Sequence, residues 1–268
     1  MLLSWSSEPS SAAASGGPPL APPTTLPLER HAVFLDLDGT LLDYAPHPRA
    51  VAADAPLLAL LETLTRRSGG ALALVSGRSI EALDALLTPL RLPVSGLHGF
   101  ERRSASGART RHAVPSAQAL ALARGLLAEV AARDPRIRLE DKRFALALHF
   151  RQIPELEPAI VEAARAIAAQ VGGGLEMLLG PRVVELTPQG VSKASAIAEF
   201  MREPPFAGRR PLFVGDDATD ELAFEWVNAA GGLSVAVNPA GVTSASTRLR
   251  SVREVRTWLH GLLGGDSG

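Results

Sequence analysis

The segment Phe34–Tyr44 constrains the fold of this chain more than any other, because two acidic residues follow directly on an apolar run. Asp36 and Asp38 come after Ala32-Val33-Phe34-Leu35, and Gly39 follows at once. Carboxylates at the end of a buried strand are costly unless a cation or hydrogen-bond donors stabilise them. If the chain turns at Gly39, both side chains can converge on one ligand. The alternative is an ordinary Asp-Gly turn after a strand.

Short apolar runs alternate with helical segments in two separate parts of the chain. The first part predicts strands and helices in turn at 32–35, 56–67, 71–75, 79–90 and 94–97. The second predicts helices and strands in turn at 193–201, 212–214, 219–227, 234–237 and 254–263. This alternation indicates a parallel sheet with right-handed crossovers. We therefore expect an α/β fold with a doubly wound parallel sheet built from two distant pieces of sequence.

The middle of the chain has a different pattern, which we interpret as an inserted α+β cap domain. Its helices and strands are expected at 118–132, 143–150, 157–171, 175–179 and 182–186, with Gly180-Pro181 as a turn. An insert at the carboxyl ends of parallel strands would cover the crevice where such sheets bind ligands. We divide the chain into a disordered tail at 1–29, a first core part at 30–107, the cap at 108–189 and a second core part at 190–264.

Composition excludes several classes of protein. The formal net charge of -1 gives no basic excess for nucleic acid, and no apolar window is long enough to cross a membrane. The chain has no cysteine, which excludes disulfides and thiolate chemistry, so we expect a cytoplasmic enzyme. Of the 27 basic residues only Lys142 and Lys193 are lysine. A compact ammonium suits a narrow phosphate or sugar site, although two ordinary surface lysines are the alternative.

A second acidic group follows the late strand at 212–214, where Asp216, Asp217, Asp220 and Glu221 lie within six positions. Such crowding is unfavourable without a cation, and Mg²⁺ binds to few protein oxygens while keeping waters and a phosphate. Helix capping explains part of the group, since Asp217 suits an N-cap and Asp220 a first turn. We predict Asp216 as a metal ligand, with Asp217 and Asp220 as candidates for supporting it.

Two shorter pieces complete the pattern. Ser76-Gly77-Arg78 follows the strand at 71–75, and Lys193 stands near the start of a helix. A hydroxyl at a strand end and a cation near helix amides both favour phosphate binding. Taken singly, Ser76 could be a turn residue and Lys193 an exposed helix lysine.

These four pieces, in this order, resemble the haloacid dehalogenase superfamily of phosphotransferases. The resemblance implies that Asp36 is the nucleophile, which forms an aspartyl-phosphate, and that Asp38 is the general acid and then the general base. Asp38 should therefore be protonated when substrate binds. It further implies that Ser76 and Lys193 bind the phosphoryl oxygens and that Mg²⁺ is held by Asp36, Asp38 and Asp216.

The superfamily resemblance covers residues 31 to about 262, and a narrower resemblance, to trehalose-6-phosphate phosphatases, appears in details beyond the core motifs. It lies in SGRSIEALDALL, GLHGFERR, LEDKRFALALHFR, RVVELTPQGVSKASAI, FVGDDATDE and NPAG. It implies hydrolysis of trehalose 6-phosphate in trehalose biosynthesis, a mobile cap, and a functional link to a trehalose-phosphate synthase. Glu140, Lys142 and Glu185 match cap positions that grip the distal glucose hydroxyls, and Arg78 is expected to bind substrate.

Several alternatives remain. The core motifs do not encode the substrate, so another sugar phosphate, such as sucrose phosphate or a glycerate-linked mannosyl phosphate, would use the same chemistry. A sugar-phosphate sensor without turnover belongs to a different class, and the intact acidic residues argue against it. Glu140 and Lys142 could be a surface pair and Glu185 an edge-strand residue. We place His98 and Glu101 at the junction of core and cap, as braces or ligand contacts, and interpret His149 as a strand residue.

Overall fold

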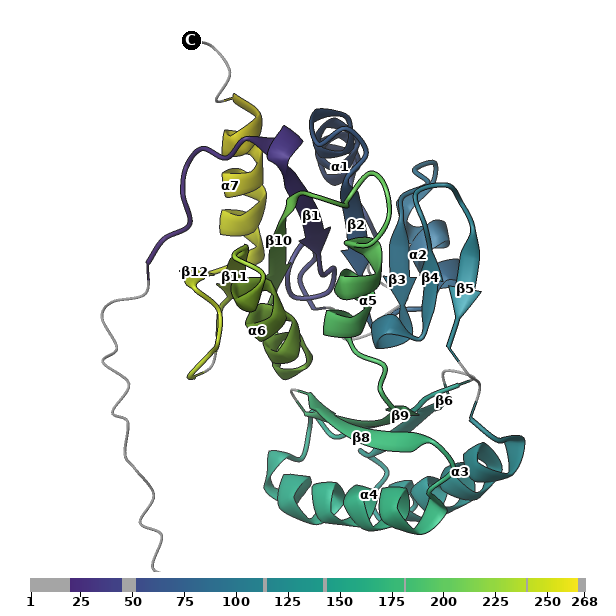
Figure 1. The fold of residues 1–268 in the computed structure, drawn as a ribbon. Helices are drawn as coiled ribbons and strands as arrows, with labels where there is room; N and C mark the ends of the chain where they lie inside the picture. The colour runs from purple at the N-terminus through teal and green to yellow at the C-terminus, as the bar shows by residue number, and fades with distance from the viewer. Residues whose placement is uncertain are drawn as a thin grey trace, which may run out of the picture.

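The computed structural model describes residues 20–44, 52–112, 115–141, 144–180, 182–239 and 241–264. An eight-stranded sheet forms the larger part of the fold, and a four-stranded sheet lies below it in Figure 1. The strands of the large sheet are β1 (His31–Leu35), β2 (Leu72–Val75), β3 (Val94–Gly96), β4 (Glu101–Arg103), β5 (Arg109–Arg111), β10 (Arg210–Gly215), β11 (Leu233–Val237) and β12 (Thr247–Leu249).

The strand order is β12-β11-β10-β1-β2-β3-β4-β5. All pairs from β12 to β3 are parallel, and β4 and β5 add to one edge as antiparallel strands. The two distant pieces of sequence meet where β1 pairs with β10 in the middle of the sheet. The predicted parallel sheet is therefore observed, with an antiparallel edge that the sequence pattern did not predict.

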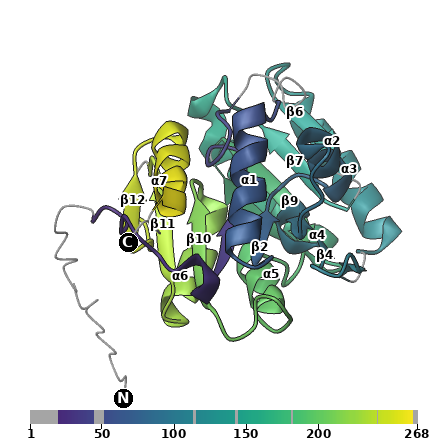
Figure 2. The same ribbon diagram turned by 90° about the horizontal axis from the view of Figure 1, so that it is seen from above.

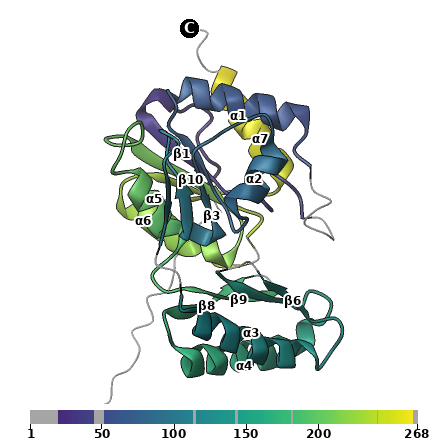
Figure 3. The ribbon, with the colours of Figure 1, turned by 90° about the vertical axis from the view of Figure 1, so that its right-hand side faces the viewer.

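Helices cover both faces of the large sheet (Figures 2 and 3). One face carries α1 (Ala55–Arg67), α2 (Ile80–Leu87) and α7 (Val252–Gly264), and the other carries α5 (Lys193–Phe200) and α6 (Glu221–Ala229). Along β1, Val33 and Leu35 pack into the first layer, whereas Ala32 and Phe34 pack into the second. Burial on both faces is why this strand is apolar throughout. The sheet is doubly wound, as predicted.

The smaller sheet has the order β6-β7-β9-β8, and all its pairs are antiparallel. Its strands are β6 (Arg138–Asp141), β7 (Leu146–His149), β8 (Leu175–Gly180) and β9 (Val183–Pro188). The helices α3 (Ala117–Ala131) and α4 (Glu157–Val171) pack on its far side around a separate hydrophobic core. Its other face is turned toward the large sheet (Figure 3). This is the expected α+β cap.

Four short 3-10 helices complete the described chain, namely η1 (Leu28–Arg30), η3 (Leu97–Gly99), η4 (Pro154–Leu156) and η5 (Ala218–Asp220). Two of them matter for the site: η3 follows β3, and η5 follows β10, both on the side of the cap. In the part of the chain that the structure describes, no helix is long and apolar enough to cross a membrane.

Two details differ from the expected domain limits. Residues 109–111 were assigned to the cap, but they form β5, which pairs with β4 of the large sheet. The predicted tail is described from residue 20 onward, and its last part packs on the core: Trp258 Nε1 of α7 donates a hydrogen bond of 2.7 Å to the Pro23 carbonyl, and Leu28 is buried. Residues 1–19 and Pro181 of the predicted turn lie outside the described residues.

Candidate active site

Three predicted site residues follow three neighbouring strands. Asp36 comes directly after β1, Ser76 after β2 and Asp216 after β10, and these strands are adjacent and parallel in the order β10-β1-β2. The Asp36 amide still donates to the Val214 carbonyl at 2.9 Å, so the sheet fixes the backbone up to the first acidic residue. Because parallel strands end at one edge, the sheet itself brings these three residues together.

Lys193 lies among the buried carboxylates at this edge. Its Nζ is 3.2 Å from Asp36 Oδ1 and 2.6 Å from Asp220 Oδ1, and all three side chains are at most 6% exposed. Lys193 is the first residue of α5, where Ser192 and Ser195 form a capping box. Burial disfavours its charge, but Asp220 and Asp36 outweigh that effect and raise the pKa of Lys193 above its ordinary value.

The pKa of Asp36 is raised well above its ordinary value. Burial is the main cause, and the neighbouring Asp216, Asp217 and Asp38 add to it, while Lys193 acts in the opposite direction. A nucleophilic carboxylate has to be ionised, so one lysine does not supply enough positive charge for this site. A bound divalent cation would favour the ionised form.

The acidic group contains a constellation suited to such a cation. Ligand oxygens of Asp36, Asp216 and Asp220 lie within 4.8 Å of one another. Asp220 is already engaged, because its Oδ2 accepts from the amides of Asp216 and Asp217 at 2.9 and 3.1 Å and its Oδ1 accepts from Lys193. Because Asp220 already carries three hydrogen bonds, one of them from a lysine, we take Asp36 and Asp216 as the candidate ligands and Asp220 as a support of the loop that carries Asp216.

The backbone at Gly39 passes close to the carboxylate of Asp216. Gly39 has a φ of +81°, and a Cβ added there would lie 2.0 Å from Asp216 Oδ2. Tyr44 OH donates to the same oxygen at 2.9 Å, and Thr40 Oγ1 donates to Oδ1 at 3.4 Å. Burial and repulsion from Asp217 and Asp220 raise the pKa of Asp216 to about 7. All-oxygen donors with excess negative charge fit Mg²⁺.

Asp217 is the N-cap of η5, which is the alternative role that the sequence allowed for it. Its Oδ1 accepts from the amide and the hydroxyl of Thr219 at 2.8 and 2.6 Å, at the start of η5. Although burial opposes its charge, Lys193 and the Thr219 donors hold the pKa of Asp217 below its ordinary value. It supports the loop instead of belonging to the ligand constellation, which comprises Asp36, Asp216 and Asp220.

Asp38 and Arg78 form a bidentate pair. Arg78 Nε is 2.6 Å from Asp38 Oδ2, and its Nη2 is 2.6 Å from Oδ1. The Asp38 carboxylate is therefore held toward the Ser76–Arg78 loop and does not belong to the constellation around Asp216. The sequence placed Arg78 among the substrate-binding residues, whereas in this conformation its guanidinium binds the predicted general acid.

The Ser76–Arg78 loop is held between β2 and the segment that follows β3. Ser76 is buried, its amide donates to the Ser95 carbonyl at 2.9 Å, and its Oγ accepts from the Arg78 amide at 3.2 Å. The Ser76 carbonyl accepts from the His98 amide at 3.0 Å. This loop is therefore a rigid platform at the strand edge beside Asp36.

The cap presents two of its three predicted sugar-binding residues to the core. In the strand register Glu140 of β6 pairs with Ala147 of β7, and Ala147 pairs with Glu185 of β9. Their neighbours Leu146, Leu148, Val184 and Leu186 point into the helix-covered core of the cap. Because side chains alternate along a strand, Glu140 and Glu185 share the opposite face, two strands or about 9.5 Å apart. Lys142 lies outside the described residues.

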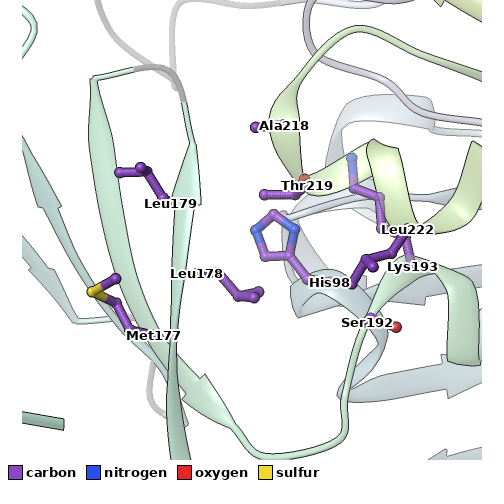
Figure 4. Close-up of a pocket in the computed structure, with 9 residues that line it drawn as sticks. All are labelled: His98, Met177, Leu178, Leu179, Ser192, Lys193, Ala218, Thr219 and Leu222. Carbon is purple, nitrogen blue, oxygen red and sulfur yellow. The ribbon is translucent and has the colours of Figure 1, made fainter. Parts of the chain in front are cut away.

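A cavity of about 160 Å³ lies between cap strand β8 and the core, and Figure 4 shows its lining. Leu178 and Leu179 border it from the cap, and Lys193, Thr219 and His98 border it from the core. His98 was placed at the core–cap junction, and it does contact the cap there, 3.0 Å from Glu185.

Glu101, which was also placed at that junction, is a brace within the core. Its Oε1 accepts from the Ile80 amide at the start of α2 at 2.7 Å, and its Oε2 pairs with Arg111 of β5. His149 lies on β7, as expected of a strand residue, and its Nε2 is 2.8 Å from Glu140 Oε2.

Sequence reasoning missed the role of Tyr44. Besides its bond to Asp216, its ring lies under the guanidinium of Arg151 from the cap, with 4.8 Å between the guanidinium carbon and the ring centroid. Its place at the end of the acidic segment 34–44 was the available signal, but nothing in the pattern assigned the side chain a partner.

Comparison with known proteins agrees with this geometry. The family model described as trehalose-phosphatase matches residues 34–255. The chain is 45% identical over 233 residues to the trehalose-6-phosphate phosphatase of Escherichia coli (strain K12), covering 86% of this chain and 85% of that protein. It is 33% identical over 239 residues to a bifunctional trehalose-6-phosphate synthase/phosphatase of Thermoproteus tenax, covering 87% of this chain and 32% of that protein.

Among solved structures, the C-terminal domain of Candida albicans trehalose-6-phosphate phosphatase superposes with a TM-score of 0.79 at 22% identity, covering 92% of this chain and 99% of that domain. That likeness confirms the predicted fold. The family match and the sequence relatives confirm the family resemblance, and the chain belongs to the trehalose-phosphatase family.

Proposed function

We propose that this protein is a Mg²⁺-dependent phosphomonoesterase that hydrolyses trehalose 6-phosphate to trehalose and phosphate through an aspartyl-phosphate on Asp36. One observation carries the proposal: the buried Asp36 lies beside both a lysine and a candidate metal ligand, at the strand edge that faces the carboxylates of the cap. Such an arrangement provides the nucleophile and charge neutralisation on the core and sugar contacts on the cap.

The proposed reaction uses two aspartates in different roles, with Asp36 as the nucleophile and Asp38 as the residue that donates and accepts the proton. An Asp36 oxygen attacks phosphorus and forms a P–O bond as the bond to the sugar oxygen breaks, and Asp38 gives its proton to that oxygen. Water then attacks the aspartyl-phosphate, Asp38 takes the proton of the water, and phosphate leaves with Asp36 regenerated. Ser76 and Lys193 would bind the phosphoryl oxygens, since both are buried beside the nucleophile.

The metal would be held by Asp36 and Asp216. Asp38, the third predicted ligand, has its carboxylate on Arg78 in this conformation and lies outside their constellation. When bound, Mg²⁺ supplies positive charge that reduces the repulsion between Asp36 and a phosphate dianion. The raised pKa of both Asp36 and Asp216 supports this assignment, because a buried acidic group with one lysine favours binding of a cation.

Arg78 links substrate binding to the general acid. A bidentate guanidinium contact is made to a carboxylate anion, whereas a general acid has to hold a proton. Arg78 therefore has to release Asp38 before the proton transfer, and the phosphate of the substrate is the anion that can attract it. This supports the prediction that Arg78 binds substrate once the site is filled.

The cap would provide selectivity for the sugar. Carboxylates on its inner face can accept hydrogen bonds from hydroxyls of the distal glucose, and a ligand without those hydroxyls would leave buried polar groups unpaired. Glu140 and Glu185 share that face, which supports their predicted role, and Lys142 follows Glu140 by two positions in the sequence. A functional link to a synthase is supported by the bifunctional relative, and the absence of cysteine supports a cytoplasmic location.

A substrate panel tests the proposal. Phosphate release is measured from trehalose 6-phosphate, glucose 6-phosphate and sucrose 6-phosphate in the presence of Mg²⁺. We expect a clear preference in kcat/KM for the trehalose ester, which Glu140→Gln and Glu185→Gln both reduce. Equal turnover of all three esters would be compatible with the proposed phosphatase mechanism but would refute the sugar-binding role of Glu140 and Glu185.

A further inference from the structure

Glu140 and Glu185, two carboxylates on the inner face of the cap, each lie against a histidine. Glu140 Oε2 lies 2.8 Å from His149 Nε2, and both residues belong to the cap. Glu185 Oε2 lies 3.0 Å from Nε2 of His98, which belongs to the core. The first pair lies within the cap, whereas the second joins the two parts of the molecule. In Figure 4 the His98 ring extends into the space between β8 and the core.

The core holds His98 in one place. Its backbone is left-handed, with φ of 57° and ψ of 24°, and its amide donates to the Ser76 carbonyl at 3.0 Å. A Cβ added to Gly77 would lie 2.5 Å from His98 Nε2, so this position of the ring needs a glycine in the Ser76–Arg78 loop. The position of this imidazole is thus set by the same loop that carries Ser76.

The contact is buried and is not yet aligned as a hydrogen bond. His98 is 7% exposed and Glu185 is 5% exposed. In the described part of the chain, neither ring nitrogen of His98 has a partner with hydrogen-bond geometry, although Nε2 lies 3.0 Å from Glu185 Oε2. Catalytic contacts are often loose before substrate binds and tighten in the complex. A small rotation of the cap against the core would align this pair.

We propose that His98 is a positioning residue that orients Glu185 toward the distal sugar and so couples sugar recognition by the cap to the Ser76–Arg78 loop. The inference rests on the proposed function, because it concerns how the cap recognises trehalose. The contact ties the Glu185 carboxylate to a histidine that the core holds in place. Removal of His98 changes the position of this buried carboxylate relative to the sugar, which weakens its discrimination between sugars.

The test is a steady-state comparison of three variants on two substrates. Asn tolerates a left-handed backbone but is too short to reach Glu185, so His98→Asn removes the contact without strain. His98→Gln places an amide N–H near the position of Nε2. His149→Asn is the matched control within the cap. The substrates are trehalose 6-phosphate and p-nitrophenyl phosphate, which has no sugar and reports the core chemistry alone.

We expect His98→Asn to lower kcat/KM for trehalose 6-phosphate by ~10-fold to ~100-fold, the range for losing one hydrogen bond to a charged group, mainly through KM. Turnover of p-nitrophenyl phosphate should change less than ~2-fold, and His98→Gln should recover part of the loss. The effects of His98→Asn and Glu185→Gln should be non-additive, whereas those of His98→Asn and Glu140→Gln should add. For the control, the effects of His149→Asn and Glu140→Gln should be non-additive, whereas those of His149→Asn and Glu185→Gln should add.

An equal loss on both substrates, or additive effects of His98→Asn and Glu185→Gln, would overturn the inference, since His98 would then be a general structural residue. If the wild type prefers trehalose 6-phosphate and His98→Asn keeps that preference, the inference alone fails. If the wild type itself has no such preference, the proposed function fails and the inference falls with it.

Discussion

Lys193→Met isolates the charge of the buried lysine, because methionine keeps most of the volume of the side chain and removes the ammonium. Lys193 is 2% exposed and lies 2.6 Å from Asp220 and 3.2 Å from Asp36. Removing one partner of a buried ion pair costs ~3 to 5 kcal/mol, since the other charge is left uncompensated. For a chain of this length that corresponds to a fall in Tm of ~6 to 20 °C.

The loss should depend on pH in a defined direction. The pKa of Asp36 is raised in the folded protein, and removing Lys193 raises it further. Such a group contributes to stability below its unfolded pKa, and that contribution is lost as pH rises through the folded pKa. The variant should therefore be least stable relative to the wild type near pH 8 and should regain stability toward pH 5, where the buried acids take up protons.

The assay is urea unfolding with chelator at pH 8 and pH 5, followed by far-UV circular dichroism. Arg165→Met is the control, because Arg165 pairs with Glu162 on the surface of α4 with side chains 60% and 71% exposed, where an ion pair contributes at most ~1 kcal/mol. If Lys193→Met is as stable as Arg165→Met at pH 8, Lys193 does not neutralise the buried acids and the electrostatic account of the site is wrong.

Three further predictions concern the metal and the general acid. Because the pKa of Asp216 is about 7, a proton competes with Mg²⁺ for this carboxylate, and Mg²⁺ affinity measured by calorimetry should fall ~10-fold between pH 8 and pH 6. An affinity that does not change with pH would contradict Asp216 as a metal ligand. Gly39→Ala should displace Asp216 and weaken Mg²⁺ binding ~10-fold or more, whereas Gly107→Ala, with a similar φ of +86° and no atom within 4 Å of the added Cβ, should leave binding intact. Asp38→Asn should lower phosphate release from trehalose 6-phosphate by ~100-fold or more, and unchanged activity would remove Asp38 from the mechanism.

The residues at the strand ends could be predicted because topology alone brings them together. Asp36, Ser76 and Asp216 each follow an apolar run, and parallel strands deliver such positions to one edge. The short polar strands β4 and β5 were missed, since Glu101–Arg103 and Arg109–Arg111 have no apolar alternation, and their pairing depends on the neighbouring β3.

Contacts between side chains could not be predicted in the same way. The Arg78–Asp38 pair joins two motifs whose separate roles were expected, but nothing in the sequence says that an arginine will bind the general acid before a phosphate does. His98 and Glu185 are far apart in the sequence and belong to different parts of the fold, so their contact follows only from how the cap sits on the core.

The central claim is that trehalose 6-phosphate is hydrolysed by Asp36 with Mg²⁺, and the most direct test is phosphate release from that ester by the wild type, Asp36→Asn and Asp43→Asn. The control Asp43→Asn removes the same charge at an exposed position seven residues after Asp36. The account predicts Mg²⁺-dependent release that chelator and Asp36→Asn both abolish and that Asp43→Asn retains. Release that persists in Asp36→Asn would contradict the nucleophile, and no Mg²⁺-dependent release by the wild type would contradict the enzyme itself and favour a sugar-phosphate sensor.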